Sequence, residues 1–164
     1  MSQIALRLLD GGMGRELKRI GAPFRQPEWS ALALIEAPEF VLQAHGAFIA
    51  AGARIITTNS YAVVPFHIGD ARFAEQGRLL AERAGRLARQ AASASVEPVA
   101  VAGSLPPALG SYRPDLFDHQ RSVAIHRELI DGLQAHVDVW LAETQSSTAE
   151  VRAVVEALGA QSKP

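Results

Sequence analysis

The chain has 164 residues, of which 48% are hydrophobic and 20% charged, a composition typical of one globular domain with its own core. Sixteen Lys and Arg against 17 Asp and Glu give a net charge of −1, so nothing favours nucleic acid as a partner. No apolar run reaches the roughly 18–20 residues of a membrane span, and the first residues do not resemble a signal peptide. Cysteine is absent, which excludes disulfides and thiolate metal ligands within the chain and fits a cytoplasmic protein.

Four short apolar runs are predicted strands: residues 6–10, 54–58, 99–102 and 137–142. Each is followed by Gly, Asn, Ser or an acid. Runs without polar alternation suit strands that are covered on both faces, as in parallel sheets.

A helix is predicted after each of the last three apolar runs, and another between the first run and the second. The first covers residues 38–52, opened by Pro38 and stopped by Gly52. Others are predicted at about residues 71–95 and over 118–135. The last, over 147–159, begins with a capping box of Ser147 and Glu150.

This alternation predicts an α/β protein with right-handed crossovers and a parallel sheet. It fits an open doubly wound sheet or one half of an eight-stranded barrel. The segment D-G-G-M-G after the first run lacks the G-x-G-x-x-G spacing of dinucleotide-binding folds. A complete (β/α)8 barrel needs about 200 residues or more, so a barrel-like chain of this length holds only four βα units.

Polar residues follow the predicted strands at the ends where parallel βα proteins carry their active sites. Two of them, Asp10 and Glu143, are carboxylates. Such a pair can act as an acid and a base, bind a divalent metal, or clamp an ammonium group. Equally, Asp10 can cap the following turn and Glu143 can pair with an Arg. The position of both acids at strand ends favours a functional role.

Four segments resemble, in order, the amino-terminal half of the homocysteine S-methyltransferases. They are LLDGGMGRELKRIG, PEWSALALIEAPEFVLQAHGAFIAAGARIITTNSYA, VAGSLPPALGSYRPDLF and VDVWLAETQSSTAEVRAVVEAL. The ordered motifs D-G-G-M-G, T-N-S-Y, A-G-S-L-P-P and A-E-T carry the resemblance, which covers residues 8–158. It implies a TIM-barrel fold of the (β/α)8 type, of which residues 1–164 form the first four βα units, a half barrel, as a single domain.

The implied activity is transfer of a methyl group to the sulfur of homocysteine, giving methionine, as in methionine biosynthesis. In this family a zinc ion binds the thiol as thiolate, which is the nucleophile. The methyl donor is a sulfonium or quaternary ammonium compound, such as S-methylmethionine, S-adenosylmethionine or betaine. Its positive charge makes the methyl carbon electrophilic, so the reaction depends mainly on alignment.

The resemblance also implies a substrate-binding set. Glu143 of A-E-T matches the acid that holds the amino group of homocysteine, and Asp10 matches a second acid nearby. Gly11 and Gly12 allow close approach of the backbone to a ligand, or serve only the turn. Asn59 of T-N-S-Y belongs to the same set.

Two aromatic residues, Tyr61 and Trp29, resemble positions that line the donor side in some family members. Their faces can hold a methylated cation by cation–π attraction, worth about 0.5–2 kcal/mol each. For Trp29, hydrophobic packing over one end of the barrel is an equal alternative.

The family's zinc ligands are cysteines from later strands, which this chain lacks, so we expect no zinc ligand and no catalytic residue here. Four histidines fall in predicted helices (His45, His119, His126 and His136) and His67 in a loop, and we expect no histidine metal site. A half barrel leaves strand edges and an apolar face open, which predicts self-association or a complementary half-barrel as partner. The alternative function is an inactive remnant that acts as an oligomerising or interaction module.

Overall fold

The computed structural model describes residues 7–160 and 163–164, and within them one parallel sheet carries the fold. Its strands are β1 (Ile55–Thr57), β2 (Ala100–Leu105) and β3 (Val139–Ala142), in the order β1-β2-β3. Both neighbouring pairs are parallel, with Ile55 opposite Ala100 and Ala102 opposite Val139. The three later predicted strands and the parallel sheet are therefore confirmed.

All four predicted helices are also confirmed, as α3 (Pro38–Ala50), α5 (Asp70–Ser93), α6 (His119–Leu133) and α7 (Thr148–Leu158). The capping box of α7 is complete. The Glu150 N–H donates to Ser147 Oγ at 3.2 Å, and the Ser147 N–H donates to Glu150 Oε2 at 2.9 Å.

The prediction of a full strand over residues 6–10 is wrong. Leu6 lies outside the described residues, and Leu9 forms a single parallel bridge with Ile55. Beyond Asp10, whose N–H donates to the Ile55 carbonyl at 3.0 Å, the chain turns away into α1 (Met13–Arg19). Only one residue pair stays in register, so three strands form the sheet in the part of the chain described.

Four short elements lie in segments for which no helix or strand was predicted. They are α1, α2 (Ser30–Glu36), α4 (Pro65–Ile68) and the 3-10 turn η1 (Pro114–Leu116). Each is too short to show a helical period in the sequence. His67 consequently lies in α4 rather than in a loop, and His136 follows the end of α6 rather than lying in it.

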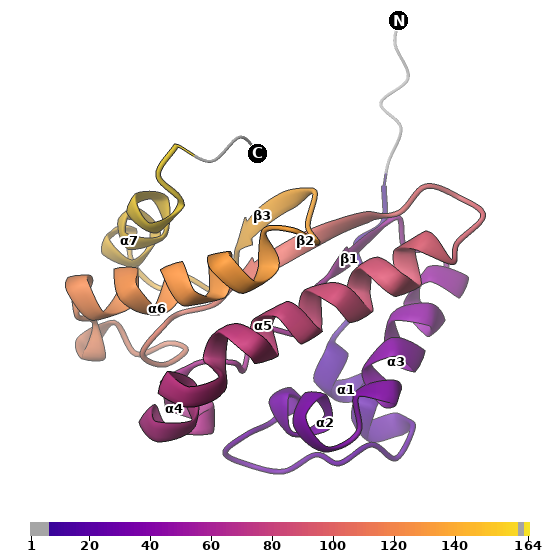
Figure 1. Cartoon of the computed structure of the whole chain (residues 1–164), viewed down its shortest axis with the longest axis horizontal. Helices are drawn as coiled ribbons and strands as arrows, with labels where there is room; N and C mark the ends of the chain where they lie inside the picture. The colour runs from indigo at the N-terminus through magenta and orange to yellow at the C-terminus, as the bar shows by residue number, and fades with distance from the viewer. Residues whose placement is uncertain (1–6, 161–162) are drawn as a thin grey trace, which may run out of the picture.

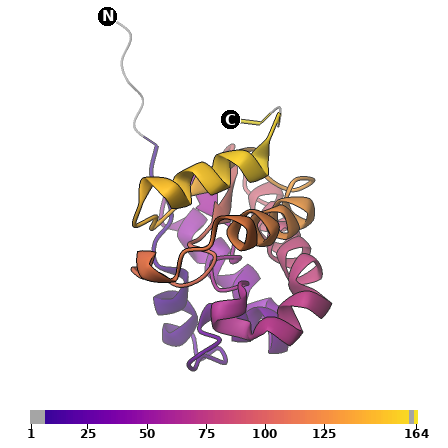
Figure 2. The same ribbon diagram turned by 90° about the vertical axis from the view of Figure 1, so that its left-hand side faces the viewer.

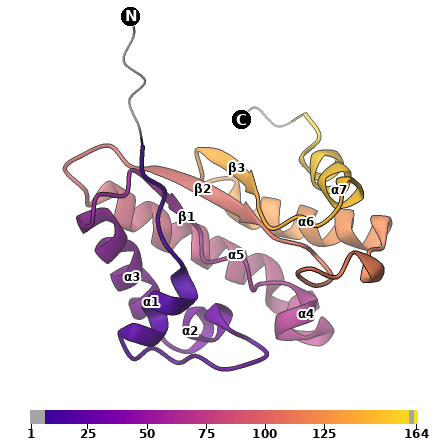
Figure 3. The same ribbon diagram turned by 180° about the vertical axis from the view of Figure 1, so that it is seen from behind.

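The helices α3, α5 and α6 lie on one face of the sheet, as the front and back views show (Figure 1, Figure 3). The core between them is formed by fully buried side chains such as Ile56, Val101, Leu129 and Leu133. Helix α7 packs beside α6 (Figure 2). No helix within residues 7–160 is long and apolar enough to cross a membrane.

Candidate functional site

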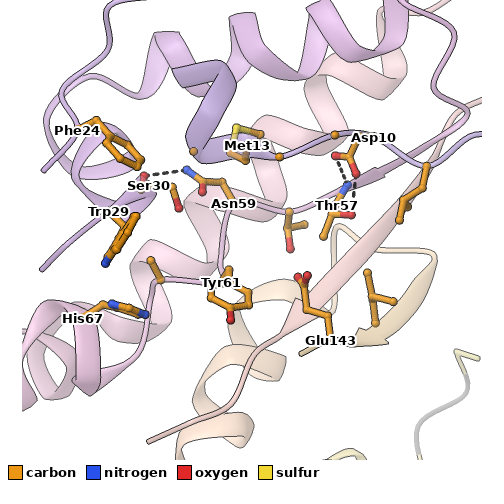
Figure 4. A pocket seen from close by; sticks show the side chains of 17 residues that line it. Asp10, Met13, Phe24, Trp29, Ser30, Thr57, Asn59, Tyr61, His67 and Glu143 are labelled. Carbon is orange, nitrogen blue, oxygen red and sulfur yellow. Dashed lines mark hydrogen bonds between the residues drawn. The ribbon is translucent and has the colours of Figure 1, made fainter. Parts of the chain in front are cut away.

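A cavity of about 320 Å³ lies where the strands end. All seven residues of the predicted substrate-binding set line it: Asp10, Gly11, Gly12, Trp29, Asn59, Tyr61 and Glu143. Figure 4 shows the two carboxylates toward one end and Trp29 toward the other, with Tyr61 between them. No Lys or Arg is among the described residues that line the cavity, so its fixed charge is negative.

Asp10 is held by the end of the neighbouring strand. The Thr57 N–H donates to Asp10 Oδ2 at 2.8 Å, and the Thr57 hydroxyl donates to Oδ1 at 2.9 Å. Both bonds favour the ionised carboxylate, but burial outweighs them and raises the pKa of Asp10 above its ordinary value.

Glu143 is held in the same way from β2. It directly follows β3, and its Oε1 accepts a hydrogen bond from the hydroxyl of Ser104, a residue that is fully buried. Burial raises the pKa of Glu143, the Ser104 bond lowers it, and the negative charge of Asp10 raises it further. The two carboxylates are therefore close enough to influence each other's ionisation.

A buried network of hydrogen bonds among Thr58, Ser60 and Ser104 lies beside Glu143. The Ser104 N–H donates to Thr58 Oγ1 at 3.0 Å, and Ser60 Oγ donates to the Ser104 carbonyl at 2.9 Å. Thr58 then donates to Ser60 Oγ at 2.9 Å, which gives every hydroxyl in the chain of bonds a partner. Buried polar groups that are all satisfied rigidify a site, so the Ser104 hydroxyl is fixed before any ligand enters.

The two glycines of D-G-G differ in what surrounds them. A Cβ on Gly11 would lie 2.9 Å from Phe48 Cε1 on α3, so this glycine permits α3 to pack behind the cavity. A Cβ on Gly12 would find its nearest neighbour, Arg15 Cβ, at 3.9 Å, which is ordinary contact. The close contact with the Phe48 ring therefore favours a glycine at position 11, whereas no neighbour does so at position 12.

The other end of the cavity is aromatic. The rings of Trp29 and Phe24 meet edge to face with centroids 5.7 Å apart, and Trp29 is 42% exposed. The hydroxyl groups of Tyr61 and Ser111 are hydrogen-bonded at 2.6 Å, which orients the Tyr61 ring. This end offers π-faces, whereas the opposite end offers carboxylates.

Asn59 connects the two ends. Its Nδ2 donates to the carbonyl of Ser30 at 3.1 Å, while its Oδ1 is buried with no hydrogen-bond partner. A buried acceptor without a partner costs about 1–3 kcal/mol, and this oxygen has almost no surface that a ligand could contact.

Sequence reasoning missed three residues that shape this site: Thr57, Ser104 and His67. Ser104 lies inside the motif A-G-S-L-P-P and Thr57 directly precedes T-N-S-Y, so their positions at the strand ends were the available signal. For His67, which lies in the short helix α4 and lines the cavity, no sequence pattern indicated a role in the site.

The described residues do not fit a metal centre. No group of three or more His, Asp or Glu side chains in residues 7–160 is arranged to hold an ion, and the sequence contains no cysteine. Two carboxylates held by hydroxyl donors suit an organic cation better.

Comparisons with known proteins identify the family of the chain. The sequence profile of the homocysteine S-methyltransferases matches residues 7–164. The homocysteine S-methyltransferase of Escherichia coli (strain K12) is 34% identical over 169 residues, which cover 93% of this chain and 54% of that enzyme. A selenocysteine methyltransferase of Astragalus bisulcatus is 36% identical over 85 residues, covering 51% of this chain and 25% of that protein.

Solved structures give the same result. The oxidized form of the Escherichia coli homocysteine methyltransferase superposes with a TM-score of 0.80 at 32% identity, covering 93% of this chain and 57% of that one. Its metallated form gives a TM-score of 0.78, covering 58% of that chain. The chain thus spans little more than half the length of these relatives. A profile match over nearly all its residues shows that it belongs to the homocysteine S-methyltransferase family.

Proposed function

We propose that residues 1–164 form, as a single domain, the amino-acid-binding half of a homocysteine S-methyltransferase barrel, with Asp10 and Glu143 as the clamp on the ammonium group of homocysteine. The observation that carries this is a pair of oriented carboxylates in a cavity that no described Lys or Arg lines. Charge-assisted hydrogen bonds from an ammonium group to such carboxylates are about twice as strong as neutral ones.

The acceptors match the donors of a primary ammonium group. Such a group has three N–H donors, and the cavity offers two carboxylates, each of which can accept more than one hydrogen bond. The raised pKa values of Asp10 and Glu143 add to this complementarity, because a bound cation relieves the cost of ionising both groups in a buried space.

The aromatic end suits the methyl donor. The faces of Trp29 and Tyr61 can attract a sulfonium or quaternary ammonium group, which places its methyl carbon toward the amino acid. In the transfer, a new bond forms between the homocysteine sulfur and the methyl carbon while the bond to the cationic atom breaks. The donor leaves as a neutral thioether or amine, so this step needs alignment rather than an acid.

Activation of the thiol has to come from outside the described residues, because they do not fit the zinc ion implied by the family. A complementary half-barrel or a second copy of the chain is the proposed source. Strand β3 is at the end of the order β1-β2-β3, so within the described residues no strand pairs with its outer edge, and a partner can add a strand there.

Calorimetric titration with homocysteine tests the clamp. The Glu143→Gln variant keeps the size of the side chain but removes its charge, so affinity should fall about tenfold or more. Glu128→Gln changes the same charge at an exposed position on α6 and should bind like the parent chain. The parent should also bind 4-mercaptobutyrate, which lacks the amino group, much more weakly. Equal binding of both ligands, or by parent and Glu143→Gln, would disprove the clamp.

A further inference from the structure

We infer that His67 is a positioning residue that fastens Trp29 over the aromatic end of the cavity and so sets the preference for a methylated cation. The identity of that cation rests on the proposed function above. The positioning itself rests only on contacts within the chain.

Trp29 belongs to a connecting segment, residues 23–30, that leads from α1 into α2 and is called here the Trp29 strap. Two side chains from other elements donate to its backbone. His67 of α4 is bonded through Nδ1 to the Pro27 carbonyl at 3.0 Å, and Asn59 donates to the Ser30 carbonyl at 3.1 Å. The two bonds lie on either side of Trp29 in the sequence, so they fix both flanks of the residue that faces the cavity.

The backbone of Trp29 needs such support. Its φ of +49° with ψ of −128° lies in a region that residues with a side chain rarely adopt. Conformations of this kind cost on the order of 1–3 kcal/mol and persist only where the surroundings hold them. The Trp29 N–H also donates to the Arg25 carbonyl at 2.7 Å, within the strap itself. Loss of an external bond is therefore expected to release Trp29 rather than leave it in place.

The chemistry of His67 suits this role. A carbonyl oxygen only accepts, so the proton must lie on Nδ1. Burial lowers the pKa of His67 below its ordinary value, which keeps the ring neutral near neutral pH. The ring packs edge to face on Phe66 with centroids 5.0 Å apart, and lies 6.5 Å from the Tyr61 ring. His67 thus connects α4 to the strap without adding positive charge where a cation would bind.

Two substitutions separate the hydrogen bond from the ring. His67→Phe keeps an aromatic ring against Phe66 but removes the donor to Pro27. His67→Asn loses the ring but places an amide N–H near the position of Nδ1. If the hydrogen bond is what positions Trp29, Asn should restore what Phe removes.

The first readout needs no ligand. The chain has two tryptophans, and in a Trp140→Phe background Trp29 is the only one. This change breaks no hydrogen bond of the Trp140 side chain, because its buried indole N–H has no partner. We expect His67→Phe to increase acrylamide quenching of Trp29 and lower its fluorescence anisotropy, with His67→Asn close to the parent. Unchanged quenching in His67→Phe, or equal quenching in both variants, would overturn the inference.

The second readout is selectivity between S-methylmethionine and methionine, which differ by one cationic methyl group. His67→Phe should weaken binding of S-methylmethionine by about two- to thirtyfold, the range that one cation–π contact supplies. Binding of methionine should change by less than about twofold, because its neutral sulfur gains no cation–π attraction from the aromatic rings. An equal loss for both ligands would contradict a role in selectivity. If the parent binds neither ligand, the proposed function fails, while the quenching result still decides whether His67 positions Trp29.

Discussion

Thr57 donates hydrogen bonds to both oxygens of the Asp10 carboxylate: its N–H lies 2.8 Å from Oδ2 and its hydroxyl lies 2.9 Å from Oδ1. Ser104 holds Glu143 in a similar way, so each acid is oriented by a hydroxyl residue on an adjacent strand. Orientation of a carboxylate before the ligand arrives reduces the entropy lost on binding. The two hydroxyl residues are therefore expected to matter for affinity although neither carries charge.

Thr57→Val tests the hydrogen bond from the Thr57 hydroxyl to Asp10. Valine matches the shape of threonine but lacks the hydroxyl, so the backbone bond to Oδ2 remains and the bond to Oδ1 is lost. We expect homocysteine affinity, measured by calorimetry, to fall about three- to tenfold, with the fold retained. Thr148→Val, at an exposed position that begins α7, is the matched control. Full affinity in Thr57→Val would show that Asp10 needs no hydroxyl support.

The affinity for homocysteine should fall as the pH is lowered. This loss should begin at a higher pH than it would if the two carboxylates had ordinary pKa values. An ammonium group needs ionised partners, and burial raises the pKa of both Asp10 and Glu143. Affinity should therefore be lost as the pH falls through these raised values. In Ser104→Ala the bond that lowers the pKa of Glu143 is gone, so the loss should begin at a still higher pH. Calorimetric affinities across the acidic range check this, and identical profiles for the two proteins would contradict it.

Glu143→Gln should stabilise the chain while it weakens binding. A carboxyl group whose pKa is raised in the folded state contributes stability that is present at low pH and lost as the pH rises through the raised pKa. At neutral pH the ionised group therefore costs stability, and a neutral amide removes that cost. Solvent screening at this partly exposed site keeps the gain below about 1 kcal/mol, which is about 2–4 °C in the unfolding midpoint. A lower midpoint for the variant at pH 7 would contradict this sign.

The sequence predicted the parts of the structure that depend on local pattern. The capping box of Ser147 and Glu150 placed the start of α7, because its bonds join residues only three apart. The positions of Asp10 and Glu143 at strand ends were sufficient to bring both into one cavity, since parallel strands end at the same edge.

What escaped prediction depends on contacts between distant residues. The segment ending at Asp10 forms one bridge rather than a strand because the chain turns into α1. Helix α1 is too short for a helical period to be recognised in the sequence. The bond from His67 to Pro27 joins residues 40 apart, and the positive φ of Trp29 is imposed on a residue that does not favour it. No local pattern encodes either feature.

Two glycines in helices are expected to respond oppositely to alanine. A Cβ on Gly132 of α6 would lie 2.5 Å from the Arg78 carbonyl oxygen on α5, so Gly132→Ala must push the two helices apart and should cost about 1–3 kcal/mol or more. A Cβ on Gly46 of α3 would have no neighbour within 4 Å, so Gly46→Ala should add about 0.5–1 kcal/mol through helix propensity. Urea unfolding of both variants measures the difference. Equal stability would mean that α5 and α6 do not approach as closely as Gly132 permits.

His45 should make the fold sensitive to acid. Its side chain on α3 is fully buried, neither ring nitrogen has a hydrogen-bond partner, and burial lowers its pKa to about 4. Since the unfolded chain takes up the proton nearer pH 6.5, stability that is present above that value is lost as the pH falls toward 4, by roughly 3 kcal/mol. His45→Leu removes this proton uptake, so the free energy of unfolding from urea titrations should fall less between pH 7 and pH 4 than in the parent. A smaller slope should remain from His126, whose pKa burial also lowers. If the two proteins lose stability equally over this range, His45 is not protonated on unfolding and its environment is more polar than its burial indicates.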